Sequence, residues 1–434
     1  MLSRRTTAAA IAGTAAVALV LTGCAGGSSE PTSSPTSSSS APSDEQITLT
    51  VATFNNFGYT DELLAQYTEL HPNIKVEHTI AATSNDARSN YFTKLGAGSG
   101  LADVEAVEID WFAELMQYSD KLYDLTDPSV ADRWLSWKTE AATDKDGRLV
   151  AYGTDIGPEG ICYRTDLFEA AGLPTDPDEV AALLAGDWDN YFRVGAEYVS
   201  KTGKAWFDSA AATYQGMINQ VQAAYEDPST GEVIATENPE VRAIYEEVLA
   251  ASATQSAHLS QWSPDWAAGQ ANGDYATMLC PGWMLGVISG NAPDVTTWRV
   301  ANAFPGGGGN WGGSYLTVPA QGEHLEEAKA LANWLTSPEV QLQAFLNAGT
   351  FPSQVALYDD PALLDATNEY FGNQAVGGIF ADRADAVTVA PFKGPKYFAI
   401  NDAMVQALGR VDIDGTDDVE SSWAKFVADV QALG

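Results

Sequence analysis

Apolar and polar positions change along this chain in short blocks that predict strands and helices in turn. Residues 47–54 show a period of two and are rich in β-branched side chains, which is typical of a strand. A helix is predicted next, with Thr60 as its N-cap and His71-Pro72 at its end, because the residue before proline avoids the α region. Residues 73–76 and 104–109 are predicted to form two further strands.

The alternation continues toward the carboxyl end. Residues 325–346 are predicted to hold two helices, the second with Ser337 as N-cap and Pro338 at its first position. A strand–helix–strand order favours a parallel sheet with right-handed crossovers. The pattern therefore predicts an α/β fold.

The amino terminus has the pattern of an export signal. Arg4 and Arg5 precede an apolar run over residues 8–21, which is shorter than the roughly 20 residues that span a membrane. The run ends in Leu-Thr-Gly-Cys, which resembles the bacterial lipobox, and this resemblance implies that Cys24 is acylated. The alternative is an ordinary secretion signal with a coincidental cysteine. We expect a lipoprotein signal peptide over 1–23 and a lipid-anchored linker rich in Ser, Pro and Thr over 24–44.

Composition excludes several classes of function. Of 434 residues 58 are acidic and 22 basic, and the net charge of −36 repels phosphate backbones and anionic lipid, so no nucleic-acid partner is expected. The three Cys and four His show no metal-ligand spacing, and no Lys-Ser/Thr follows the glycines at 306–309. We therefore expect no metal and no cofactor.

Two smaller motifs each allow more than one structural interpretation. Residues 412–417 resemble half of a calcium loop, but the glycine comes too early, so we expect a solvated turn. Cys162 and Cys280 both fall on predicted strands. They either form a disulfide outside the cell or remain two buried thiols.

Motifs along most of the chain carry a resemblance to one family. Residues 97–104 look like its AxAxGxxPDV stretch, and residues 152–174 look like its YP…LYYNKDLFEEAGLP segment, although Arg164 replaces Asn and Ala102 replaces Pro. Further matches follow in family order at 187–191, 273–278, 281–283, 304–306, 312–313, 337–339 and 349–352. The chain thus resembles the family 1 solute-binding proteins, the carbohydrate-binding lipoproteins of bacterial ABC importers.

The resemblance implies a two-lobe fold of the type II periplasmic-binding-protein kind, with discontinuous lobes joined by crossing hinge strands. Lobe one would comprise 45–155 and 310–350, and lobe two 156–309 and 351–434. It further implies an oligosaccharide in the interlobe cleft, an ABC permease as partner, and an extracytoplasmic location with a lipid anchor at the outer face of the cell membrane. We expect a monomer that is not an enzyme.

Sugar recognition needs aromatic faces for the C–H side of a pyranose and polar side chains for its hydroxyl rim. The resemblance places Trp283, which follows Gly282, at the sugar. Trp311 lies in a glycine-rich loop next to Gly312, where little local core is available. Packing in the core is the alternative for both indoles.

The other candidates lie mainly at the ends of predicted strands. Asp110 matches a carboxylate that accepts sugar hydroxyls in related proteins, or it is a helix N-cap, and Asn55, Asn56 and Tyr59 could equally form a plain turn. The remaining candidates are Trp111, Asp155, Trp266, Arg383 with the nearby Lys393, and Tyr397.

The sequence leaves open which sugar binds and whether the protein is a receptor, a hydrolase or an adhesin. Residues 280–286 and 308–313 look most like cello-oligosaccharide binders, which favours that ligand over xylo- or malto-oligosaccharides. A secreted glycoside hydrolase needs only two carboxylates about 5–10 Å apart, and the many acids leave that alternative open. An adhesin for insoluble polymer is a third alternative.

Overall fold

The computed structural model describes residues 46–434. The expected signal peptide over 1–23, the acylated Cys24 and the linker over 24–44 lie outside the described residues. Within 46–434, no helix has both the length and the apolar character to cross a membrane.

The first lobe is built on a five-stranded sheet with the order β2-β1-β3-β9-β4. Its strands are β1 (Ile47–Phe54), β2 (Ile74–Ala81), β3 (Val104–Glu108), β9 (Ser314–Thr317) and β4 (Ala151–Gly153). β1 is parallel to β2 and β3, as predicted, but β9 is antiparallel to both of its neighbours. A purely parallel sheet was thus the wrong expectation, because β9 returns from the other lobe and enters the sheet where β3 ends.

The helices of the first lobe begin where their caps predict. Thr60 accepts a hydrogen bond from the Leu63 amide at the start of α1, and Ser337 accepts one from Val340 at the start of α13. The helices of this lobe are α1 (Asp61–Leu70), α2 (Ser84–Ala97), α3 (Ile109–Met116), α4 (Ser136–Ala141), α12 (Leu325–Leu335) and α13 (Pro338–Ala348). Except for α4, they share one apolar core with the sheet.

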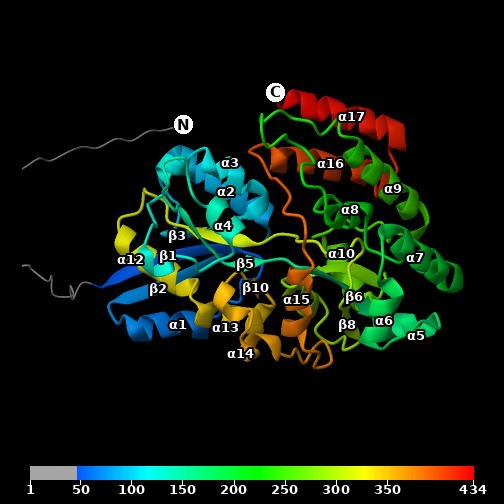
Figure 1. The fold of residues 1–434 in the computed structure, drawn as a ribbon, viewed down its shortest axis with the longest axis horizontal. Helices are drawn as coiled ribbons and strands as arrows, with labels where there is room; N and C mark the ends of the chain where they lie inside the picture. Colours follow the sequence, from blue (N-terminus) through cyan, green and yellow to red (C-terminus); the bar gives the residue numbers. More distant parts are fainter. Residues whose placement is uncertain (1–45) are drawn as a thin grey trace, which may run out of the picture. The chain divides into compact units, whose positions relative to one another are not determined.

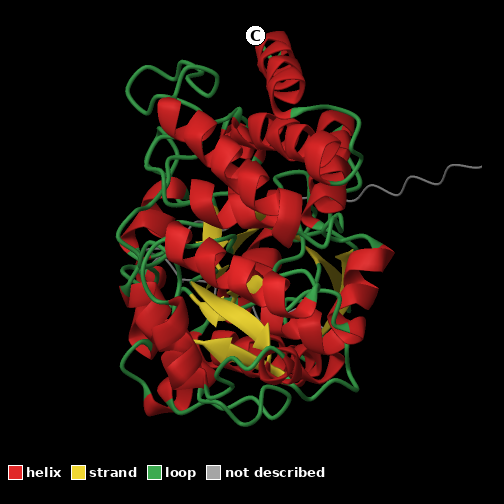
Figure 2. Ribbon diagram, turned by 90° about the vertical axis from the view of Figure 1, so that its right-hand side faces the viewer, coloured by secondary structure: helices red, strands yellow, loops and turns green. Residues whose placement is uncertain are grey.

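The second lobe surrounds an antiparallel sheet with the order β7-β6-β8, formed by β6 (Glu159–Arg164), β7 (Thr277–Pro281) and β8 (Trp298–Ala301). A disulfide joins Cys162 on β6 to Cys280 on β7, with Cα atoms 5.3 Å apart, and this decides between the two alternatives for these cysteines. Helices enclose the sheet (Figure 2). They are α5 (Thr165–Ala170), α6 (Pro177–Leu184), α7 (Trp188–Thr202), α8 (Ala210–Ile218), α9 (Pro239–Gln255), α10 (Pro264–Asn272), α11 (Met284–Asn291), α14 (Pro361–Leu364), α15 (Val376–Asp385), α16 (Tyr397–Asp412) and α17 (Val419–Ala432).

Three chain segments pass between the lobes (Figure 1). β5 (Asp155–Ile156) and β10 (Phe351–Pro352) pair antiparallel, and a single bridge joins Pro158 to Asn310 on the third segment. The crossing segments lie close to the lobe limits expected from the sequence, at 155, 310 and 350. Those limits themselves stay a prediction.

A buried acid on β3 gives the first lobe a pH dependence. Glu105 is 8 % exposed, and burial raises the pKa of its carboxyl from 4.5 to about 7, partly offset by the Ala102 amide and by Lys94. The folded state therefore holds this proton more tightly than the unfolded chain, so the stabilisation is complete below pH 4.5 and lost as the pH rises through about 7.

We expect Glu105→Gln to flatten this dependence. Between about pH 4.5 and 7 the free energy of unfolding of the native protein should fall by up to about 3 kcal/mol more than that of the variant. Urea titrations of both proteins at several pH values measure the difference. An identical pH slope in the two proteins would show that Glu105 does not titrate in this way.

Candidate functional site

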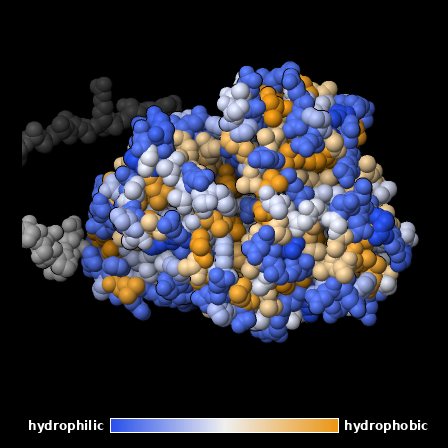
Figure 3. All heavy atoms as spheres, in the orientation of Figure 1, coloured by the Kyte–Doolittle hydropathy of each residue, from blue (hydrophilic) through white to orange (hydrophobic). Residues whose placement is uncertain are grey.

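One cavity of about 790 Å³ lies between the lobes and is lined by residues of both. In the space-filling view a hollow separates the two halves of the molecule, with hydrophobic side chains beside it (Figure 3). The volume lies within the range of small-molecule sites, about 300–1,000 Å³. This cavity is the candidate binding site.

The first lobe contributes the carboxyl ends of its parallel strands. Asn55 and Asn56 follow β1, residues 83–85 follow β2, and Asp110 is the second residue after β3. Open α/β sheets bind ligands at this edge, because backbone groups and polar side chains of the loops there are available to bond to a ligand. Asn55 has a φ of +49°, a left-handed conformation that asparagine tolerates better than most residues. This wall is therefore rich in amide, hydroxyl and carboxylate groups.

The second lobe and the crossing segment contribute three indoles. Trp283, in the turn between β7 and α11, has its ring centroid 5.6 Å from that of Trp311 with the planes at 82°. It lies 6.0 Å from the ring of Trp262, with the planes at 24°. The Trp283 Nε1–H donates a hydrogen bond of 2.9 Å to the Trp311 carbonyl oxygen. The three side chains thus form a continuous aromatic surface on the cavity.

A close backbone approach fixes Trp311. Its amide donates to the Gly157 carbonyl at 2.8 Å, and the Gly157 amide donates to the Asn310 side chain at 2.9 Å. A Cβ atom on Gly157 would lie 1.7 Å from the Trp311 carbonyl oxygen, so only glycine fits there. Trp311 is therefore held by backbone contacts between two crossing segments.

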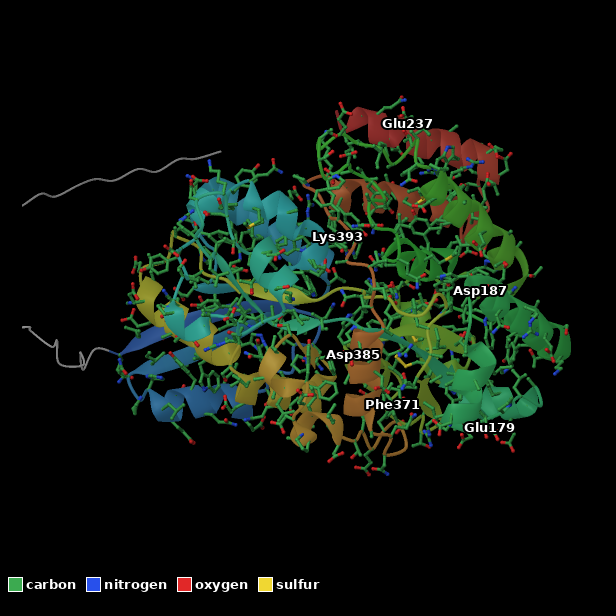
Figure 4. All side chains as sticks on the ribbon, in the orientation of Figure 1. Glu179, Asp187, Glu237, Phe371, Asp385 and Lys393 are labelled. Carbon is green, nitrogen blue, oxygen red and sulfur yellow. A yellow bond between two sulfur atoms is a disulfide. The ribbon has the colours of Figure 1, made fainter. Side chains whose placement is uncertain are left out.

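An ion pair closes part of the gap between the lobes. Asp110, in the first turn of α3, pairs with Lys393, whose side chain is 5 % exposed, on the segment that precedes α16 (Figure 4). Burial alone would lower the pKa of Lys393, but the Asp110 carboxylate raises it above its ordinary value. The N-cap of α3 is Glu108, which accepts from the Asp110 amide at 2.9 Å. Asp110 therefore lines the cavity while its carboxylate is paired with Lys393, and burial followed by the Asp110 charge raises the pKa of Glu108.

A second buried lysine supports the crossing strands. Lys138 Nζ donates to the carbonyl oxygens of Asp155 at 2.6 Å and Ser314 at 2.8 Å, and burial lowers its pKa to about 8. Burial also raises the pKa of Asp155, and its carboxylate accepts from the Ser314 amide at 3.1 Å. Asp155 therefore lines the cavity and also ties two crossing segments together.

The ionisable side chains on the cavity surface are mainly acids. Five carboxylates and one guanidinium line it, namely Glu108, Asp110, Asp155, Asp402, Asp414 and Arg410. Arg410 pairs with Asp417, whose side chain is 8 % exposed. Such a surface disfavours anionic ligands and suits neutral molecules with many hydroxyl groups. Among the described residues, no group of three or more His, Cys, Asp or Glu is arranged to hold a metal ion.

Comparison with known proteins decides the family. Residues 62–372 match the family model described as bacterial extracellular solute-binding protein. A crystal structure of an extracellular solute-binding protein of family 1 is similar to this chain with 44 % identity and a TM-score of 0.77, covering 89 % of this chain and 99 % of that one. The chain belongs to the bacterial extracellular solute-binding proteins. Its place of action is therefore outside the cytoplasm.

Two further relatives share less sequence identity with this solute-binding protein. The arabinooligosaccharide-binding protein of Bacillus subtilis (strain 168) is 26 % identical over 310 residues, which are 67 % of this chain and 69 % of the relative. The ABC transporter associated binding protein of B. animalis subsp. lactis Bl-04, solved with β-1,6-galactobiose, has 19 % identity and a TM-score of 0.74, and the match covers 88 % of this chain and 96 % of that one. The latter likeness shows a shared fold.

The structure of this solute-binding protein brings many of the predicted site residues together. The residues predicted from the sequence that line the cavity are Asn55, Asn56, Asp110, Asp155, Trp283, Trp311 and Gly312. Their sequence positions span both lobes and the crossing segments, so a single folded cavity unites them. Their contact with a ligand remains a prediction.

Six predicted residues are absent from the cavity lining, and each makes contacts elsewhere in the fold. Trp111 is fully buried and donates to Ser84 Oγ, Tyr59 contacts the Leu335 carbonyl, and Trp266 donates to Asp208. Tyr397 is buried against Tyr225, while Arg383 donates to the Gly307 carbonyl. Gly282 approaches the Gly349 backbone, since a Cβ there would lie 2.7 Å from its carbonyl oxygen.

Some lining residues were not predicted. Trp262 is not among the candidates from the sequence, and Gln215 and Asn401 come from helices whose pattern gives no functional signal. The expected solvated turn at 412–417 is also wrong at both of its ends, because the side chains of Asp412 and Asp417 are 1 % and 8 % exposed. The left-handed backbone that sets Trp262 apart, with a φ of +70°, is visible only in the folded chain.

Proposed function

We propose that this solute-binding protein is the receptor of an ABC importer for a neutral oligosaccharide, with cello-oligosaccharides as the best candidates. The observation that carries the proposal is the cavity itself, where three indoles meet a wall of amides and carboxylates. Indoles cover the C–H faces of sugar rings, and the polar wall can bond to their hydroxyls. The relative from Bacillus subtilis, named for arabinooligosaccharides, supports an oligosaccharide as the class of ligand.

The preference for cello-oligosaccharides rests on shape. A β-1,4-linked glucan is flat and presents C–H faces on both sides, which suits the rings of Trp262 and Trp283, whose planes are 24° apart. The proposal includes delivery of the sugar to the permease and attachment to the membrane through acylated Cys24. Two lobes joined by three short segments can close on a ligand by a hinge, and the closed form is what a permease can recognise.

Titration calorimetry against a panel of sugars tests the proposal. We expect binding of cellotriose, weaker binding of xylo-, malto- and arabinotriose and of lactose, and no binding of an oligogalacturonate, because the cavity is acidic. Chromatography after long incubation should recover every sugar intact. Cleavage products would favour the glycoside hydrolase, and the absence of binding to any neutral sugar would contradict the receptor.

A further inference from the structure

The loop between α9 and α10 has a backbone that needs external support. Residues 260–262 of this loop line the cavity, and Trp262 is 39 % exposed. His258 has a φ of +58° and Trp262 a φ of +70°. Residues with a side chain adopt this left-handed conformation only when their surroundings fix it. Contacts elsewhere must therefore determine where Trp262 lies.

One buried carboxylate supplies much of that support. Asp412, at the end of α16, bonds through Oδ1 to His258 Nδ1 at 2.8 Å. Its Oδ2 accepts from Ser256 Oγ at 3.1 Å and from the Ala210 amide, in the first turn of α8, at 2.8 Å. Ser256 Oγ in turn accepts from the His258 amide at 2.9 Å. Asp412 thus connects three walls of the cavity, namely α8, α16 and the Trp262 loop.

None of the supporting groups belongs to the cavity surface. Of the loop and its anchors, residues 260–262 line the cavity, whereas Ser256, His258 and Asp412 are absent from its lining. Trp262 lies against Trp283 with ring centroids 6.0 Å apart. A change at His258 therefore reaches a ligand indirectly, through the placement of the loop and its indole or through Asp412 and the two helices that it joins.

We propose that the His258–Asp412 pair is a positioning device that holds Trp262 against Trp283, so that Trp262 forms a third aromatic contact for the ligand. His258 and Asp412 are positioning residues for the binding of sugar. The inference rests on the proposed function, since it assigns to the same cavity an indole and two supporting side chains.

Variants at position 258 distinguish the effect of losing the hydrogen bond to Asp412 from the effect of the strained backbone. His258→Ala removes the bond to Asp412 and places alanine at a positive φ. His258→Asn keeps an N–H donor and tolerates the left-handed backbone, so it should restore the wild-type behaviour. Asn373→Ala is the matched control, because Asn373 is exposed, has a φ of +59° and is absent from the cavity lining.

Two readouts test the device. In near-UV circular dichroism without sugar, His258→Ala should lose the same signal of the paired indoles as Trp262→Ala, while His258→Asn and Asn373→Ala retain it. In calorimetry with cellotriose, or with the tightest ligand of the panel, His258→Ala and Trp262→Ala should each bind about tenfold more weakly. The double variant should bind no more weakly than Trp262→Ala alone.

Each contrary result has a distinct meaning. Additive losses in the double variant would show that His258 does not act through Trp262, and unchanged affinity in Trp262→Ala would remove the third contact. Either result overturns the inference while the receptor stands. If the wild type binds no sugar of the panel, the proposed function fails, and the dichroism still decides whether His258 positions the indole.

Discussion

Trp283→Ala is expected to weaken the binding of cellotriose by about 30- to 150-fold. Stacking of a sugar on an indole contributes about 2–3 kcal/mol, and Trp283 occupies the middle of the aromatic surface, in contact with Trp262 and Trp311. The alanine variant also loses the hydrogen bond from Nε1 to the Trp311 carbonyl. Calorimetry at constant temperature and salt measures the loss.

Two further variants isolate the stacking contribution. Trp283→Phe keeps an aromatic face but not the Nε1–H donor, so it should retain most of the affinity. Trp423→Ala removes an indole that packs on Tyr245 and Phe426 in the second lobe, and it should reduce stability while the affinity is unchanged. Wild-type affinity in both Trp283→Ala and Trp311→Ala would show that the site has been assigned to the wrong surface.

Replacing both Cys162 and Cys280 by alanine is expected to give the largest loss of stability. The disulfide closes a loop between residues 118 apart in the sequence, and the chain-entropy model assigns such a cross-link about 5 kcal/mol. For a chain of this size that corresponds to a decrease in Tm of about 5–10 °C. Differential scanning calorimetry of the variant and of the wild type measures the shift.

The cavity should be little affected by the same change. Both cysteines are fully buried within the second lobe and are absent from the cavity lining, so cellotriose should bind the folded variant with nearly wild-type affinity. Wild-type protein incubated with a reductant should show the same lowered Tm. A variant as stable as the wild type would contradict a stabilising role for the cross-link.

Local signals in the sequence predict much of the fold. The strand over 47–54 and the helix caps Thr60 and Ser337 are confirmed, because each depends on residues within one or two turns of the chain. The antiparallel entry of β9 depends on a partner distant in sequence, as in the pairing of Glu105 with Thr317. No local pattern encodes the direction of such a strand.

Local sequence patterns also fail to predict which single side chains face the cavity. Asp110 and Trp111 follow one strand, yet Asp110 lines the cavity and Trp111 is fully buried. Successive residues of a helix point about 100° apart, so position at a strand end cannot tell which neighbour faces the ligand. Trp262 was missed for a related reason: the Asp412 carboxylate behind its loop is 154 residues away from His258.

The late arrival of β9 has a consequence for the order in which the protein acquires its structure. An exported chain emerges amino end first, and β3 remains an open edge until residues 314–317 have crossed. Unpaired edge strands are templates for association between chains. Fragments that stop before Ser314 should therefore aggregate, and secretion of the whole protein requires that the part of the chain before Ser314 be kept from premature pairing during translocation.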